Sequence, residues 1–145
     1  ARATRAGRAG GYSYQLAFPA EAARVIETTG TRQAVFGGSV HTNHALDASV
    51  ADITFPPSPG SLGRYARAAD LRDQVEPTMA GLMSILADHG AEPQAICVHP
   101  DPADGDEGST ILFAMVADPA RCALTIASGH ACTGTFETFL LDELR

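Results

Sequence analysis

The first third of the chain contains four short segments in which β-branched, aromatic and other apolar residues gather or alternate with polar ones. They cover residues 12–18, 24–29, 32–36 and 39–42. This composition favours β-strands. Pro19, Gly30 and the pair Gly37-Gly38 fall between the segments and supply turns. Four strands at hairpin spacing predict an antiparallel sheet.

Two helices are predicted in the middle of the chain, after an irregular proline-rich loop at 43–60. Ser61 is the predicted N-cap of the first helix, over 62–75. Residues 79–86 carry apolar side chains at i, i+3, i+4 and i+7, which predicts a second helix, with Gly90 closing it.

Strand patterns return in the last third of the chain, at 95–99, 110–117 and 122–128, and the segment 135–141 is predicted to be a last strand or a short helix. The run at 110–117 is almost wholly apolar, which is typical of a strand covered on both faces. Strands, two adjacent helices and then strands again predict an α+β architecture with antiparallel sheets.

Composition argues against a nucleic-acid-binding protein and against a membrane-spanning one. The 145 residues carry a net charge of −7, and all ten basic residues are arginines. This acidic balance lacks the dense cationic face of a nucleic-acid-binding protein. No apolar run approaches the roughly 20 residues that span a membrane. Residues 1–11 contain only Ala, Arg, Gly and Thr, so we expect a linker or tail, with 12–145 forming the domain.

The three cysteines are odd in number and irregular in spacing, so they predict no disulfide framework and favour a reducing, cytoplasmic setting. All three lie in or beside apolar segments, which predicts buried, inert thiols. His41 and His44, with the pairs Cys97-x-His99 and His130-x-Cys132, offer possible metal ligands. Their spacing fits no zinc motif, and a strand would turn His41 and His44 to opposite faces. We therefore expect no metal or cofactor, although a metal-binding protein remains a weaker alternative.

Arg64 has an unusual predicted position, in the first turn of a helix. A cation is unfavourable there because the helix dipole is already positive at that end. Such an arginine tends to answer an anion, a carboxylate or a carbonyl, and the alternative is a surface arginine without that role.

Several motifs occur in the order of a known family. They are the segment Ser39-Val-His-Thr-Asn-His-Ala-Leu46, then Ser61-Leu-Gly-Arg-Tyr-Ala-Arg67, Leu86-Ala-Asp-His89, Ala95-Ile-Cys-Val-His99, Ser109-Thr110 and Gly129-His-Ala-Cys132. From about Gly11 to its end, the chain resembles the C-terminal portion of the acyl-coenzyme A:6-aminopenicillanic acid acyltransferase family, also called peptidase family C45.

The resemblance implies a partial αββα sandwich of the N-terminal nucleophile hydrolases, which cut themselves to expose a catalytic cysteine. It implies acyl transfer from an amide or acyl-CoA thioester. Asn43 matches an oxyanion-hole asparagine of related enzymes, and Arg64 matches an arginine that points into their active site. His41, His44 and Ser61 are the predicted substrate-binding residues beside them.

The nucleophile itself is missing, because Ala1 is not a cysteine and Cys97, Cys122 and Cys132 do not match the family's cleavage site. We therefore expect this chain to be the C-terminal part of a longer enzyme, inactive alone and partnered by an N-terminal part of the same protein. The alternative is a non-catalytic domain of the same fold that binds a small molecule or a partner chain.

Overall fold

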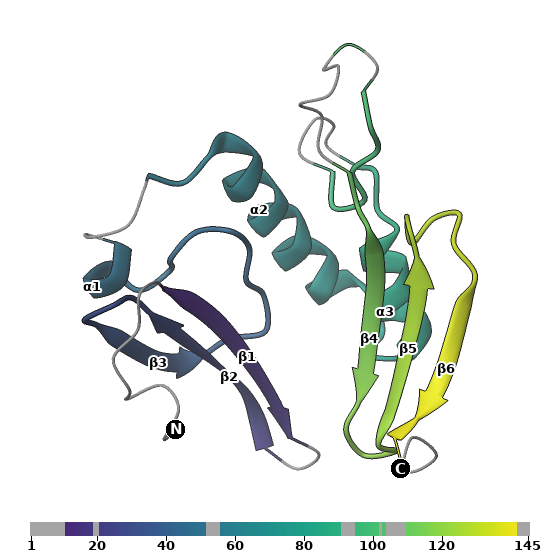
Figure 1. Cartoon of the computed structure of the whole chain (residues 1–145), viewed down its shortest axis with the longest axis horizontal. Coiled ribbons are helices and arrows are strands. Elements are labelled where there is room, and N and C mark those ends of the chain that lie inside the picture. Colours follow the sequence, from purple (N-terminus) through teal and green to yellow (C-terminus); the bar gives the residue numbers. More distant parts are fainter. Residues whose placement is uncertain are drawn as a thin grey trace. The chain divides into compact units, whose positions relative to one another are not determined.

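The computed structural model describes residues 11–18, 21–51, 56–90, 95–101, 103 and 110–141. They form two three-stranded antiparallel sheets and three helices (Figure 1). The predicted α+β class with antiparallel sheets is confirmed. The chain divides into two compact units, 1–65 and 66–145. The predicted tail lies outside the described residues except for Gly11.

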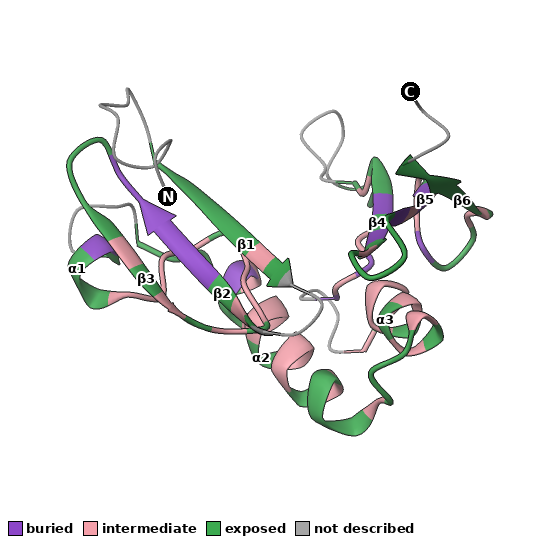
Figure 2. Ribbon diagram, turned by 90° about the horizontal axis from the view of Figure 1, so that it is seen from below, coloured by how far each residue is buried: buried purple, intermediate pink, exposed green. Residues whose placement is uncertain are grey.

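The first unit contains a meander of β1 (Tyr12–Phe18), β2 (Glu21–Thr28) and β3 (Gln33–Gly37). Register pairs Tyr12 with Thr28 and Thr28 with Gln33. The central strand β2 is the most buried, as Figure 2 shows, because both of its edges are paired. Sequence patterning therefore located these three strands, although β2 begins earlier than predicted.

The fourth predicted strand, 39–42, is wrong, because these residues form a loop. His41 and Thr42 direct their side chains to Glu27 and to the Ser61 carbonyl. Such side-chain bonds fix a loop without a strand ladder. The short helix α1 (Ala48–Ala51) follows within the region that was predicted to be irregular.

Helix α2 (Pro59–Gln74) begins earlier than predicted. Its N-cap is Ser58, whose hydroxyl accepts a hydrogen bond from the Ser61 backbone N–H at 3.2 Å. Pro59 then occupies the first helical position, where its missing N–H costs nothing. Ser61 as N-cap was wrong: it lies inside the helix and is buried, and Arg64 falls in the second turn rather than the first.

Helix α3 (Met79–Leu86) matches the predicted segment, and Thr78 is its N-cap. Its C-cap is Ala87, so the prediction that Gly90 closes the helix was wrong. Within the described part of the chain, no helix has both the length and the apolar character needed to cross a membrane.

The second unit contains a meander of β4 (Phe113–Asp118), β5 (Ala123–Ser128) and β6 (Phe136–Leu140). The segment 95–99, predicted to be a strand, is irregular. Within the described part of this chain, strand β4 is covered on one face and not on both as predicted for 110–117. Ala114 and Val116 are buried, whereas Phe113 and Met115 are 59% and 48% exposed.

One face of this second sheet is apolar and exposed. Cross-strand register places Met115 beside Ile126, and Leu124 beside Phe139, on the same face as Phe113. On the opposite face, β4 and β5 contribute small buried residues such as Ala114, Val116 and Ala127, and α3 contacts β4. Side chains such as Phe113 are thus exposed to solvent, although the apolar sequence of the strand is typical of a protein core.

Candidate functional site

The loop that follows β3 carries the predicted oxyanion residue Asn43. The Arg64 guanidinium donates a hydrogen bond from Nη2 to Asn43 Oδ1 at 3.0 Å. A guanidinium has donors only, so the atom it meets is the amide oxygen. The amide N–H groups of Asn43 are then directed away from the arginine as hydrogen-bond donors.

Asn43 lines an open cavity of about 880 Å³ in the first unit. Its walls come from β1, β2, the loop after β3 and the segment before α2, including Tyr12, Thr28, Thr42, His44 and Pro57. The cavity has the size of a small-molecule site. Asn43 is an exposed residue of this lining.

A buried carboxylate holds the loop that carries Asn43. Glu27, on the central strand β2, is only 1% exposed. It accepts hydrogen bonds from the backbone N–H groups of Leu46 and Asp47 at 2.6 and 2.9 Å, and its Oε1 lies 2.7 Å from His41 Nε2. Ser13, opposite Glu27 in the sheet, also contacts His41 Nε2. Both ends of the loop are thereby tied to β2.

A second network joins the same loop to α2. Thr42 Oγ1 donates to the Ser61 carbonyl at 3.0 Å, and Ser61 Oγ donates to Thr42 Oγ1 at 3.1 Å. His44 Nδ1 lies 2.8 Å from Ser61 Oγ. His44 Nδ1 also lies 3.1 Å from Thr42 Oγ1, so the ring nitrogen joins both hydroxyls in one network. The His44 ring packs edge-on against Tyr65.

The five predicted site residues therefore gather around one loop, but with different surroundings. Asn43 and His44 line the cavity, whereas His41, Ser61 and Arg64 are not among its lining residues. His41 is turned to Glu27, and Ser61 is buried against the loop. These two side chains anchor the cavity wall. Sequence reasoning missed Glu27. The one feature that could have indicated its role is that a charged residue follows two apolar β-formers in a predicted strand.

A group of possible metal ligands lies in the second unit and consists of His89, Cys97, His99 and Cys132. His41 and His44 do not belong to it. The prediction of three buried thiols was wrong for two of them, because Cys122 and Cys132 lie in exposed turns and Cys97 alone is buried. In the sequence, the pairs Cys97-x-His99 and His130-x-Cys132 pointed to this group. Three of their four residues belong to it, and His130 does not.

Compared with known proteins, the chain matches no protein-family model, and no curated protein matches it either. The chemistry of the site therefore rests on the side chains that form it.

Proposed function

We propose that this chain supplies the oxyanion-stabilising and substrate-binding side of an acyl-transfer site for amides or acyl-CoA thioesters. The observation that carries the proposal is the bond between Arg64 and Asn43 at the edge of the cavity. In this proposal the attacking cysteine thiolate comes from a preceding part of the same protein, because Cys97, Cys122 and Cys132 do not match the cleavage site of the family that the chain resembles. A partial αββα sandwich is part of this proposal.

The chemistry follows from the donor set. When a thiolate attacks a carbonyl, negative charge develops on the carbonyl oxygen. An amide N–H that is already aimed at that position stabilises the charge without reorganising, a contribution of about 3 kcal/mol for one donor. The Arg64 guanidinium polarises the Asn43 amide through Oδ1, which strengthens its N–H groups as donors.

Arg64 has further N–H groups beyond the one that meets Asn43. A planar guanidinium suits a carboxylate or a phosphate in two-point contact. Arg64 therefore has two roles in the proposal: it orients the Asn43 amide, and it attracts an anionic group of the substrate. The anchoring of the loop by Glu27 supplies the rigidity that such a site needs.

The exposed apolar face of the second sheet supports the proposal of a further layer. In a sandwich of two sheets, the inner faces are both apolar and cover each other. Phe113, Met115 and Phe139 have the composition of such an inner face but are exposed. An N-terminal part of the same protein is the partner that we propose to cover them.

The test uses the parent polypeptide, which includes the preceding segment, and a short-chain acyl-CoA with detection of released thiol. Asn43→Ala should lower kcat by about 100- to 1,000-fold. Arg64→Lys should lower kcat/KM, since it loses the fork geometry but keeps the charge. The matched controls are Gln33→Ala and Arg24→Lys, an exposed amide and an exposed arginine of the first unit.

Two results would overturn the proposal. One is thiol-dependent turnover by the 145-residue chain alone, which would place the nucleophile within it. The other is an Asn43→Ala variant of the parent that is folded and as active as the Gln33→Ala control. If the parent binds the acyl-CoA through Asn43 and Arg64 but never turns it over, the non-catalytic binding domain is the correct description.

A further inference from the structure

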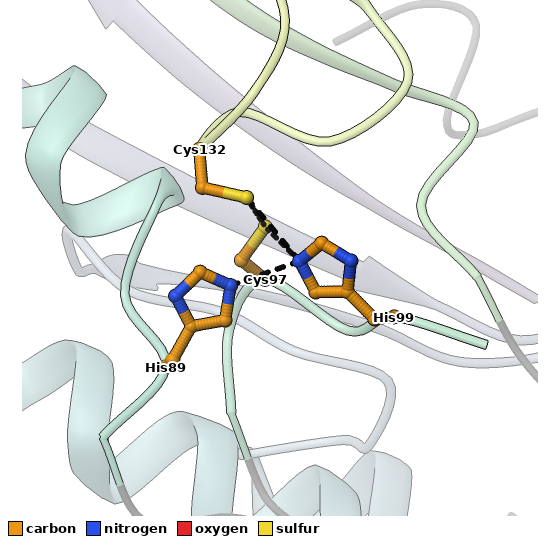
Figure 3. Close-up of side chains that lie close together, drawn as sticks. All are labelled: His89, Cys97, His99 and Cys132. Carbon is orange, nitrogen blue, oxygen red and sulfur yellow. Dashed lines mark hydrogen bonds between the residues drawn. The ribbon is translucent and has the colours of Figure 1, made fainter. Parts of the chain in front are cut away.

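Four side chains with metal-binding atoms converge in the second unit. Figure 3 shows His89, Cys97, His99 and Cys132 pointing toward one another, and their ligand atoms all lie within 4.8 Å of one another. They come from three separate segments: the chain after α3, the irregular segment around residue 97, and the turn between β5 and β6. The convergence is thus produced by the fold and not by a local motif.

The distances fit a single tetrahedral ion. Bonds of about 2.3 Å to sulfur and 2.0–2.1 Å to nitrogen place tetrahedral ligand atoms about 3.8 Å apart for two sulfurs, 3.5 Å for sulfur and nitrogen, and 3.3 Å for two nitrogens. The Cys97 and Cys132 sulfurs are 3.7 Å apart. His99 Nε2 lies 3.2 Å from the Cys132 sulfur and 3.9 Å from the Cys97 sulfur. His89 Nε2 lies 2.9 Å from His99 Nε2. These four separations are within about 0.4 Å of the tetrahedral values. The His89 nitrogen lies within 4.8 Å of both sulfurs, so ion binding would draw the His89 ring toward them.

The surroundings of the four ligands orient them. The His99 ring stacks on His130, with ring centres 4.0 Å apart and an angle of 16° between the planes. His130 is in turn within 2.9 Å of the Thr110 hydroxyl. Cys97 is the buried member of the cluster, whereas His89, His99 and Cys132 are exposed.

We propose that His89, Cys97, His99 and Cys132 form a structural Zn²⁺ site. Two thiolates and two imidazoles are a set that Zn²⁺ prefers, and hard cations such as Mg²⁺ and Ca²⁺ do not. Binding displaces the two thiol protons to solvent, so the two thiolates neutralise the charge of the ion. Four protein ligands leave no open position for a substrate, which makes the site structural.

The proposed ion joins segments that the described hydrogen bonds connect sparsely. Among the described residues, the segment around Cys97 belongs to no strand. Its two backbone contacts are the Cys97 N–H donating to the Asp88 carbonyl at 2.9 Å and the Ile111 N–H donating to the Val98 carbonyl at 3.3 Å. An ion held by His89, Cys97 and Cys132 would fasten this segment to the end of α3 and to the turn before β6. The inference concerns the second unit and does not depend on the acyl-transfer proposal for the first.

The test loads the reduced, metal-stripped chain with Co²⁺ and with Zn²⁺. The expected Co²⁺ spectrum has the intense visible bands of a tetrahedral ion and a sulfur-to-cobalt charge-transfer band, saturating at one ion per chain. Added Zn²⁺ should displace the Co²⁺ and raise the melting temperature. Cys132→Ser and His89→Gln should each weaken Co²⁺ binding at least tenfold, since loss of even an outer-shell partner of a metal ligand costs 10- to 100-fold.

Cys122→Ser is the matched control, because Cys122 is an exposed cysteine outside the cluster and should leave the spectrum unchanged. The Co²⁺ spectrum of the wild-type chain tests the proposal without any substitution, so the test stands even if a variant fails to fold. Absence of Co²⁺ and Zn²⁺ binding by the folded, reduced chain would overturn the proposal. So would an octahedral spectrum without charge transfer, or a Cys97–Cys132 disulfide that forms and persists in the presence of Zn²⁺.

Discussion

Replacing Glu27 by glutamine tests whether a buried carboxylate organises the cavity wall. Glutamine has nearly the same shape, but it offers one acceptor oxygen and an NH₂ group in place of two acceptor oxygens. If its oxygen takes the position near Leu46 and His41, its NH₂ group meets the Asp47 backbone N–H. Two donors then face each other at a side chain that is 1% exposed.

The magnitude follows from what is lost. A buried donor left without an acceptor costs about 1–3 kcal/mol, and hydrogen bonds to a charged group are worth about 1.5–3 kcal/mol each. Glutamine retains one acceptor, so we expect Glu27→Gln to lower the free energy of unfolding of the first unit by about 2–4 kcal/mol. Glu27→Ala should cost more, because it also leaves a cavity.

Tyrosine fluorescence is the assay, since all three tyrosines lie in the first unit and the chain has no tryptophan. Urea titration followed by this signal gives the free energy of unfolding of that unit. A double-mutant cycle with His41→Asn separates the imidazole contact from the two backbone contacts. The control is Glu137→Gln, an exposed glutamate of β6. A loss below about 0.5 kcal/mol, which is the range of surface substitutions, would refute the role assigned to Glu27.

Three further predictions concern the second unit, each measured by urea unfolding with far-ultraviolet circular dichroism. Thr78→Ala should cost about 1 kcal/mol, because the hydroxyl accepts from the Gly81 N–H at the start of α3, and Thr78→Ser should restore most of it. Gly81→Ala should destabilise by about 1–3 kcal/mol despite the better helix propensity of alanine, since the new methyl group would overlap the Glu76 carbonyl oxygen; a gain in stability would contradict this. Hydrogen bonds from Arg67 lower the pKa of Asp88 from its ordinary value of 3.8. The pair therefore stabilises the fold above that pH, and this stabilisation is lost as the pH falls through the lower, folded-state pKa. Asp88→Asn should reduce the loss of stability in acid, and an unchanged loss would contradict the pairing.

Local patterns were sufficient for elements whose hydrogen bonds are satisfied within a short stretch of chain. The segments 12–18 and 32–36 alternate or gather β-formers beside turn residues, and both are strands. The stripe at 79–86 is a helix, and the proline before Thr78 marks its start. In these cases the side-chain period and the turn residues agree, so sequence alone fixes the element.

Patterns failed where a side chain bonds a residue distant in sequence. His41 and Thr42 have strand-like neighbours, yet they form a loop because Glu27 and Ser61 hold them. Ser61 resembles an N-cap, but Ser58 with Pro59 after it is the better one. The candidate pair Asn43 and Arg64 was found through a family resemblance, and the 3.0 Å bond between them is a tertiary contact across 21 positions.

The cluster in the second unit shows why ligand spacing was misleading. Known zinc motifs are recognised because two ligands lie a few residues apart on one turn. Here only Cys97 and His99 are close in sequence, while His89 and Cys132 are brought in by the end of α3 and by the turn after β5. His130-x-Cys132 pointed to the right turn, but the His130 ring stacks behind His99 instead of facing the sulfurs. Two ligands close together in sequence therefore do not define a site until the tertiary structure shows which other ligands reach them. Here three segments without a shared motif supply the four ligands.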